Sequence, residues 1–224
     1  MTKKAVILLS GGMDSTTCLA MAKADGYECY AISFNYGQKQ IVELEAAKKI
    51  AANFGAVHQI VDITCLGKIA RSALTQQNLE IPDYEQRSEV PITYVPARNT
   101  IMISFALSYA ESLEADCIYI GASAIDYSGY PDCRPEYFEK FQELIKLATN
   151  AGVSGKTIQI ITPLINLTKA QTIQAGIDLG IDYKDTITCY RANAEGKACG
   201  SCDSCHLRKK GFLDMGIEDQ TIYI

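Results

Sequence analysis

An apolar run leads directly into small and hydroxyl residues in Ala5-Val6-Ile7-Leu8-Leu9-Ser10-Gly11-Gly12-Met13-Asp14-Ser15-Thr16. The apolar residues are typical of a buried strand, and a helical pattern starts at Ser15. Adjacent glycines allow a tight turn and a close approach of the backbone to a ligand. A helix that starts here presents unpaired N–H groups and a positive dipole end to an anion. The junction therefore predicts a strand–turn–helix phosphate site for a nucleotide, in preference to an ordinary turn.

The alternation of apolar runs and helical patterns continues along the chain. Strands are predicted at 5–9, 29–34, 57–62, 117–121 and 158–162, with helices at 15–25, 38–54, 99–113, 135–150 and 168–179. The strands are short and nearly all apolar, as in a parallel sheet covered on both faces. Polar loops are expected at 80–89 and 150–156. The pattern indicates repeated βαβ units and hence a doubly wound α/β fold with a mostly parallel sheet.

Chemistry-bearing segments follow several of the predicted strands. They comprise residues 10–15, 35–38, 122–134 and 163–169. In an open α/β sheet, ligands bind outside the carboxyl ends of the strands, where the chain changes direction. We therefore expect these segments to meet at one site.

Size and charge exclude several classes of protein. The 224 residues, 48% of them hydrophobic, suffice for one well-packed domain, which we assign to 1–185, and a smaller C-terminal segment, 186–224, packed on it. No apolar stretch approaches the roughly 18 residues of a membrane span, and residues 5–9 are too few for a signal peptide. A cytoplasmic protein without a membrane partner is expected. The net charge of −5 argues against direct nucleic-acid binding, and the basic run 208–210 is interpreted as a solvated helix face.

Four of the nine cysteines lie close together near the C-terminus: Cys189, Cys199, Cys202 and Cys205. Four soft donors with two-residue gaps can close a tetrahedron around one structural zinc ion per chain. An iron–sulfur cluster is the competing interpretation, although neither the bacterial nor the plant spacing matches. His206 is an alternative ligand in place of one cysteine. Lys197 and the basic run 208–210 would offset the negative charge of such a centre.

The other cysteines are scattered among mostly apolar neighbours. They are interpreted as buried free thiols that pack as small hydrophobic groups: Cys18, Cys29, Cys65, Cys117 and Cys133. An odd number of cysteines cannot all pair as disulfides.

The bend at 10–15, Ser-Gly-Gly-Met-Asp-Ser, resembles the phosphate loop of the ATP pyrophosphatase superfamily. Gly155-Lys156-Thr157 matches the end of the Walker loop motif GxxxxGK[ST]. However, Asn150 stands where that motif requires its first glycine, and the tripeptide follows a predicted helix. Further islands are Ser-Phe-Asn-Tyr-Gly-Gln at 33–38, Val-Pro-Ala-Arg-Asn at 95–99, and Asp-Tyr-Ser-Gly-Tyr-Pro-Asp-Cys-Arg-Pro at 126–135. Together with the cysteine cluster, they resemble the 7-cyano-7-deazaguanine synthase family over nearly the whole chain.

This resemblance implies a Rossmann-like fold, similar to the adenine nucleotide alpha hydrolases, with a zinc-binding helical segment at its C-terminal end. It also implies a homodimer that converts 7-carboxy-7-deazaguanine and ammonia to the nitrile in queuosine biosynthesis, with consumption of ATP. Hydroxide is a poor leaving group, whereas an acyl adenylate or acyl phosphate expels a weakly basic phosphate when ammonia attacks. A second activation, at the amide oxygen, would lead to the nitrile.

The implied ATP site comprises Leu9, Ser10, Gly11, Gly12, Met13, Asp14, Ser15, Thr16, Thr17, Cys18 and Leu19. Four residues are expected to act in catalysis: Asp14, Ser15, Lys169 and Arg98. Asp14 is expected to hold Mg²⁺, with helix capping as the alternative. Lys169 is a cation for the developing phosphate charge, and Arg98 is a fork for a phosphate or carboxylate.

Substrate recognition is assigned to Asp126, Tyr127, Tyr130, Asp132 and Arg134. A carboxylate suits the N–H edge of a guanine-like ring, a tyrosine suits its flat face, and an arginine suits the substrate carboxylate. A surface turn rich in glycine and proline is the alternative interpretation of this loop.

Two rival functions remain open at this stage. One is a tRNA-thiolating or lysidine-forming enzyme with the same loop, and the other is a non-catalytic zinc module that only binds nucleotide. A built-in glutaminase is not indicated, because the chain has only two histidines, His58 and His206. Ammonia is therefore free or supplied by another protein.

Overall fold

A computed structural model describes residues 2–85, 90–123 and 129–224 of the chain. Within them, five parallel strands form one sheet, β1 (Lys4–Leu8), β2 (Glu28–Asn35), β3 (Val57–Asp62), β4 (Cys117–Tyr119) and β5 (Gln159–Ile161). The order is β3-β2-β1-β4-β5, so the chain builds one half of the sheet outward from β1 and then crosses to build the other half. The doubly wound α/β class is confirmed, and the change of direction lies between β1 and β4.

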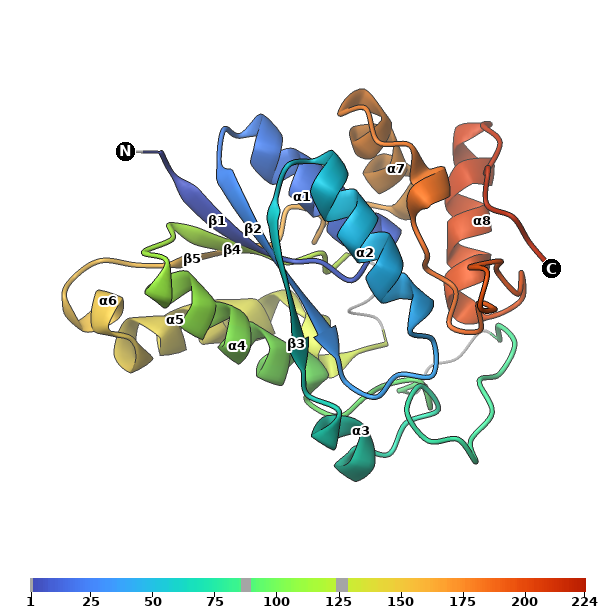
Figure 1. Cartoon of the computed structure of the whole chain (residues 1–224), viewed down its shortest axis with the longest axis horizontal. Helices are drawn as coiled ribbons and strands as arrows, with labels where there is room; N and C mark the ends of the chain where they lie inside the picture. Colours follow the sequence, from blue (N-terminus) through green and yellow to red (C-terminus); the bar gives the residue numbers. More distant parts are fainter. Residues whose placement is uncertain (1, 86–89, 124–128) are drawn as a thin grey trace.

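The five predicted helices are present as α1 (Met13–Ala24), α2 (Val42–Asn53), α4 (Arg98–Ser112), α5 (Pro135–Ala148) and α7 (Lys169–Asp178). The described residues also form α3 (Cys65–Ile69), α6 (Asn150–Val153), α8 (Asp203–Met215) and the 3₁₀ turns η2 (Pro131–Cys133) and η3 (Tyr183–Asp185). Helices α1 and α2 cover one face of the sheet, and α4 and α5 cover the other (Figure 1).

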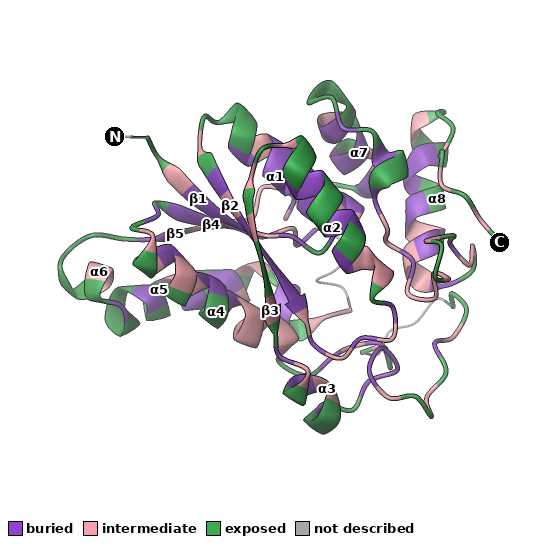
Figure 2. Cartoon of the chain, viewed as in Figure 1, coloured by how far each residue is buried: buried purple, intermediate pink, exposed green. Residues whose placement is uncertain are grey.

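Alternating residues of the central strand supply both cores. Ala5 and Ile7 pack with α1 and α2, whereas Val6 packs with α4 and α5, and all three are fully buried. Figure 2 shows the middle of the sheet as continuously buried. The strands read as unbroken apolar runs because both of their faces lie against helices.

Two local expectations need correction. The stretch 150–156 was predicted as a loop, yet α6 begins there, because the Thr149 hydroxyl accepts a hydrogen bond from Gly152 N at 2.9 Å and caps a helical turn. Helix α2 begins at Val42, four residues later than predicted. The Gln38 side chain closes a turn first, since its Oε1 accepts from Tyr36 N and its Nε2 donates to Phe34 O.

The C-terminal segment packs on the α/β part through α8, which lies beside α7 (Figure 1). Arg208 on α8 is buried and not solvated as predicted, because its guanidinium pairs with Asp219 at 3.0 Å and donates to Tyr183 O at 2.9 Å. Its charge is thereby matched by Asp219 and does not offset the cysteine cluster. Lys209 and Lys210 are exposed, as expected of a helix surface.

Four of the scattered cysteines are buried free thiols, but Cys65 is exposed at the start of α3, contrary to prediction. In the described ranges, no helix combines the length and apolar character needed to cross a bilayer.

Candidate active site and metal centre

The bend after β1 has a conformation that only glycine permits. Gly11 has a φ of +86°, and a Cβ placed there would lie 2.2 Å from Glu43 O on α2. On the opposite side, Gly121 lies just after β4 and packs closely against the start of α1. A Cβ placed on Gly121 would lie 3.0 Å from Ser15 N. The bend is therefore held between α2 and the end of β4, at the point where the sheet changes direction.

Hydroxyl groups organise the inside of the bend. Ser10 and Ser15 oxygens lie 3.1 Å apart, and the Ser15 hydroxyl donates to Gly12 O at 3.1 Å. The Thr16 and Thr17 hydroxyls donate to carbonyls one turn earlier, Gly12 O and Met13 O. Ser10 and Ser15 are thus placed to meet a ligand, whereas Thr16 and Thr17 brace the helix behind them.

A cavity of about 270 Å³ extends from this bend along the carboxyl ends of the strands. Its lining includes eight of the predicted residues: Leu9, Ser10, Gly12, Met13, Asp14, Ser15, Arg98 and Tyr130. The remaining members of the predicted ATP set are buried and lie outside the lining: Gly11, Thr16, Thr17, Cys18 and Leu19. These residues lie in the protein interior behind the cavity wall.

Asp14 and Lys169 meet across 155 residues of sequence. The Lys169 ammonium lies 2.7 and 2.9 Å from the two Asp14 carboxylate oxygens, and the lysine side chain is only 10% exposed. Gly12 is the N-cap of α1, and no side chain makes a capping hydrogen bond at this helix start, so Asp14 does not fill the capping role. The first turns of α1 and α7 are instead joined by an ion pair beside the bend.

The far end of the cavity is built around Arg98, the first residue of α4. Its guanidinium lies 5.6 Å from the centre of the Tyr36 ring, and its Nη1 is 3.4 Å from the Tyr36 hydroxyl. Burial lowers the pKa of Arg98, but the interactions with Tyr36, Tyr130 and Tyr190 raise it by more, so the net pKa is raised. Arg98 therefore stays cationic and faces the cavity as a fork for an anion.

Asp132 holds the start of α4 in place. Its carboxylate accepts from Asn99 N at 3.1 Å, while Asn99 Nδ2 donates to Asp132 O at 3.1 Å. Burial raises the pKa of Asp132 in spite of the Asn99 hydrogen bond and the nearby Arg98 charge. Asp132 lies outside the cavity lining and positions Arg98 through the helix start.

The other predicted recognition residues are separated. Tyr130 lines the cavity, with its hydroxyl 3.1 Å from Thr93 Oγ1 and 3.5 Å from the Tyr190 hydroxyl. Arg134 is exposed at the start of α5, where its Nε donates to Pro131 O. Asp126 and Tyr127 lie outside the described residues.

Among the polar lining residues that the sequence did not single out are Glu43 on α2 and Tyr190 near the cysteine cluster. Burial raises the pKa of Glu43 to about 7, against a hydrogen bond from Gln38 and the charge of Arg98. The only available signal for Tyr190 was its position next to Cys189. Glu43 carried none, because an acidic residue in the first turn of a helix is common.

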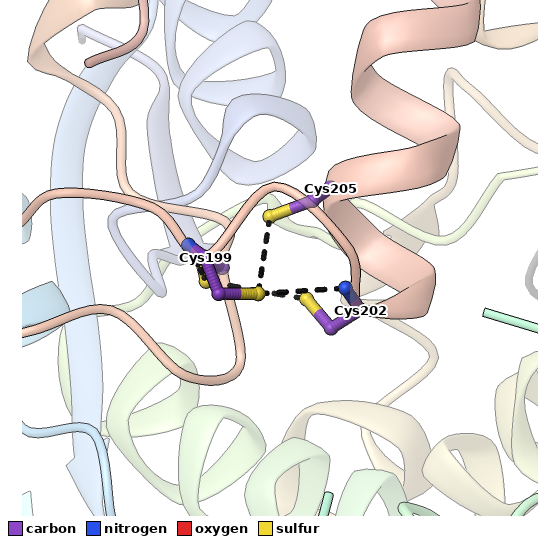
Figure 3. Close-up of side chains that lie close together, drawn as sticks. Cys199, Cys202 and Cys205 are labelled. Carbon is purple, nitrogen blue, oxygen red and sulfur yellow. Dashed lines mark hydrogen bonds between the residues drawn. The ribbon is translucent and has the colours of Figure 1, made fainter. Parts of the chain in front are cut away.

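The four clustered cysteines converge within the C-terminal segment, and Figure 3 labels three of them, Cys199, Cys202 and Cys205. All four sulfurs lie within 4.8 Å of one another, with Cys199 to Cys205 at 3.9 Å and Cys202 to Cys189 at 4.0 Å. Sulfurs about 2.3 Å from a tetrahedral metal lie about 3.8 Å apart, so this donor set fits a zinc-type centre. His206 lies outside this group and stacks on the Tyr84 ring at 3.6 Å.

Backbone hydrogen bonds connect this thiol cluster to its own segment and to the bend after β1. Arg191 N and Cys199 N each donate to the Cys189 sulfur at 3.2 Å, which suits a thiolate ligand. Two residues before Cys189, Ile187 N donates to Gly11 O at 2.9 Å. The cluster therefore holds one wall of the cavity, including Thr188, Tyr190 and Ser204.

A glycine bend at the switch point of a doubly wound sheet, continuous with a cavity that ends on a partly buried arginine, defines a protein of the ATP pyrophosphatase class. Within that class, the chain belongs to the family described as queuosine biosynthesis protein QueC, which matches residues 4–216.

Similar proteins agree with this placement. The 7-cyano-7-deazaguanine synthase of Coxiella burnetii strain RSA 331 is 61% identical over 223 residues, which cover 99% of this chain and 98% of that protein. The protein of that name from Ralstonia pickettii is 56% identical over 225 residues, with full coverage of both chains. The solved NMN synthetase of Francisella tularensis shares the fold, with a TM-score of 0.54 and 16% identity over 98% of this chain and 79% of that one.

Proposed function

We propose that this chain is an ATP-dependent carbon–nitrogen ligase that converts 7-carboxy-7-deazaguanine and ammonia to 7-cyano-7-deazaguanine in queuosine biosynthesis. The principal support is one cavity that joins the glycine bend to Arg98 and Tyr130, in a chain 61% identical to a protein of that name. A phosphate-binding end and an anion- and ring-binding end in one cavity suit a reaction that activates a carboxylate with a nucleotide.

The bend binds ATP in this proposal. The N–H groups at the start of α1 and the hydroxyls of Ser10 and Ser15 contact the phosphates, and the Lys169–Asp14 pair lies beside them. Mg²⁺, when bound, is held by Asp14 and neutralises phosphate charge. Lys169 exchanges part of its contact with Asp14 for the charge that develops on the leaving phosphate.

Arg98 orients the substrate carboxylate toward the activated phosphorus, and Tyr130 packs on the ring. Ammonia then attacks the acyl adenylate or acyl phosphate, and the phosphate leaves with the bonding electron pair. Activation of the resulting amide oxygen, loss of two protons from nitrogen, and cleavage of the carbon–oxygen bond with departure of that oxygen on the phosphate yield the nitrile. The same residues serve both activations because the second uses the same oxygen-to-phosphorus geometry.

The thiol cluster binds one structural zinc ion in this proposal. Four thiolates fill a tetrahedral shell and leave no position for water or substrate, so the metal stabilises the segment and takes no part in the chemistry. The close spacing of the four sulfurs supports this assignment.

We also expect a cytoplasmic homodimer that does not bind nucleic acid directly. Apolar side chains on the edge strand β3, such as Val57 at 47% and Ile60 at 38% exposure, offer a surface for a second copy. Sedimentation of the purified protein at micromolar concentration tests the dimer, and a single monomeric species would contradict it.

One assay tests the proposed activity. Purified protein is incubated with 7-carboxy-7-deazaguanine, ammonium, ATP and Mg²⁺, and mass spectrometry is expected to show the amide and then the nitrile. ATP turnover that requires tRNA, and is absent with the acid and ammonium, would assign the tRNA-modifying function instead. ATP binding without any phosphate release under saturating substrates would assign a non-catalytic module.

A further inference from the structure

Glu43 is a cavity-lining carboxylate for which the reaction outlined above has no use. It lies in the first turn of α2, and Gln38 Nε2 donates to its Oε1 at 3.1 Å. The Gln38 amide is itself fixed, because Tyr36 N donates to its oxygen at 2.8 Å and its nitrogen also donates to Phe34 O at 3.1 Å. Gln38 thus sets the orientation of the Glu43 carboxylate.

The second carboxylate oxygen, Oε2, has no hydrogen-bond partner among the residues that the structure describes, and the side chain borders the cavity. Nearby, Gln40 also lines the cavity, and its buried Nε2 has no partner within the same described residues. Phe34, Leu44 and Met102 supply apolar lining to the same cavity. A fixed acceptor beside an apolar wall suits a flat ring that carries N–H donors on one edge.

We propose that Glu43 is the specificity-determining residue for the substrate base, and that its carboxylate accepts hydrogen bonds from the ring N–H and the exocyclic amino group. This inference rests on the proposed function, which supplies the deazaguanine. A guanine-type edge presents two adjacent donors, which match the two oxygens of a planar carboxylate. The corresponding edge of adenine presents one donor beside an acceptor, which a carboxylate repels.

The position of Arg98 agrees with this orientation of the substrate. The Arg98 cation lies close enough to Glu43 for its charge to oppose the rise in the Glu43 pKa. One group is a cation and the other a hydrogen-bond acceptor, so they recognise different parts of the substrate. Arg98 recognises the carboxyl group at the reacting end, and Glu43 recognises the base. The two residues together select a substrate that is anionic at one end and rich in N–H donors at the other.

Proton linkage follows from the burial of Glu43. The titratable groups placed against it are Tyr36, whose pKa is raised to about 12, and Arg98, which stays cationic. With a pKa near 7, Glu43 is partly protonated in the free protein at neutral pH, and donors that bind its charged form lower that pKa. Binding of the substrate acid therefore releases a proton near pH 7, and affinity rises as pH increases through 7 and then levels off.

The test compares Glu43→Gln with the matched control Glu45→Gln, which makes the same change at an exposed position on α2. Isothermal titration measures binding of 7-carboxy-7-deazaguanine, of an analogue without the exocyclic amino group, and of ATP. In Glu43→Gln, affinity for the acid should fall about 10- to 100-fold, discrimination against the analogue should disappear, and the pH dependence near 7 should vanish. Affinity for ATP and the melting temperature should stay unchanged, and Glu45→Gln should match the wild type throughout.

Two results would overturn the inference while leaving the proposed function intact. If Glu43→Gln binds the acid and the analogue as the wild type does but turns over slowly, Glu43 transfers protons and does not select the base. If the substitution weakens ATP and not the acid, the carboxylate faces the nucleotide. A wild-type protein that neither binds the acid nor forms the nitrile would remove the proposed function, and this inference with it.

Discussion

Gly11 has the most restrictive local geometry of the site, since its backbone has a positive φ and α2 leaves no room for a side chain. We expect Gly11→Ala to destabilise the fold by about 3 kcal/mol or more and to abolish ATP binding, because both the strained φ and the contact with Glu43 O must be relieved. Chemical denaturation and nucleotide titration measure the two effects.

Gly26→Ala is the control for this prediction. Gly26 has a similar φ of +82°, but a Cβ there would meet no atom within 4 Å. It should lose only about 1 kcal/mol from the backbone conformation and retain ATP binding. Equal losses in the two variants would show that contact with α2 has no role in shaping the bend.

The Lys169–Asp14 pair is the second prediction at this scale. Lys169→Met leaves Asp14 without its counter-charge in a partly buried position, which should cost about 2 kcal/mol of stability. The rate of nitrile formation should fall by about 100-fold or more if the lysine also stabilises phosphate charge. A double-mutant cycle with Asp14→Asn separates these effects: stability should be partly restored in the double variant, while the rate should not recover.

At the scale of elements, α8 is anchored by one buried ion pair. Arg208 is 2% exposed and pairs with Asp219, whose carboxylate also accepts from the Tyr223 hydroxyl. Arg208→Met leaves a buried carboxylate without its cation and should cost about 3–5 kcal/mol, measured by denaturant unfolding. Lys210→Met removes an exposed charge from the same helix and should change stability by about 0.5 kcal/mol or less.

The same pair predicts how the C-terminal segment responds to acid. Burial raises the pKa of Asp219, but Arg208 and Tyr223 outweigh it, so the pKa lies below its ordinary value. A lowered carboxyl pKa contributes stability that is complete above the unfolded pKa of about 4 and is lost as pH falls through the folded value. The protection of α8 amides, taken relative to intrinsic exchange at each pH, should therefore fall below about pH 4 in the wild type. In Arg208→Met, exchange should be fast already at neutral pH.

At the scale of the whole molecule, the thiol cluster and the glycine bend after β1 form one connected structure. The segment that carries Cys189 donates from Ile187 N to Gly11 O and contributes Thr188 and Tyr190 to the cavity. We expect about one zinc per chain, and we expect chelation to unfold residues near the cluster and weaken ATP binding at the same time. Elemental analysis, hydrogen exchange and nucleotide titration on the same samples provide the measurements.

Two outcomes would contradict this coupling. Iron, with visible charge-transfer absorption, would replace the closed zinc centre by a cluster. Full ATP affinity in a metal-free protein whose C-terminal segment exchanges freely would show that the bend holds its shape without the wall supplied by that segment.

The class of fold, the bend and the cysteine cluster could be predicted from the sequence because each is determined by residues that are close together in the chain. Buried parallel strands must be apolar throughout, a positive φ at the bend requires glycine, and thiols two residues apart can reach one metal. These constraints act within a few residues, so composition and spacing are enough to predict them.

Tertiary packing alone decided which distant side chains meet, inside the cavity and elsewhere. Lys169 finds Asp14 from 155 residues away, Asp132 binds the start of α4 and lies outside the cavity lining, and Arg208 is drawn inside by Asp219. Glu43 and Tyr190 join the site because α2 and the cysteine segment close around it. The sequence pattern around a charged residue is the same on a solvated helix and in a buried ion pair. The packing of distant elements, together with the cost of burying an unpaired charge, determines whether the residue has a partner.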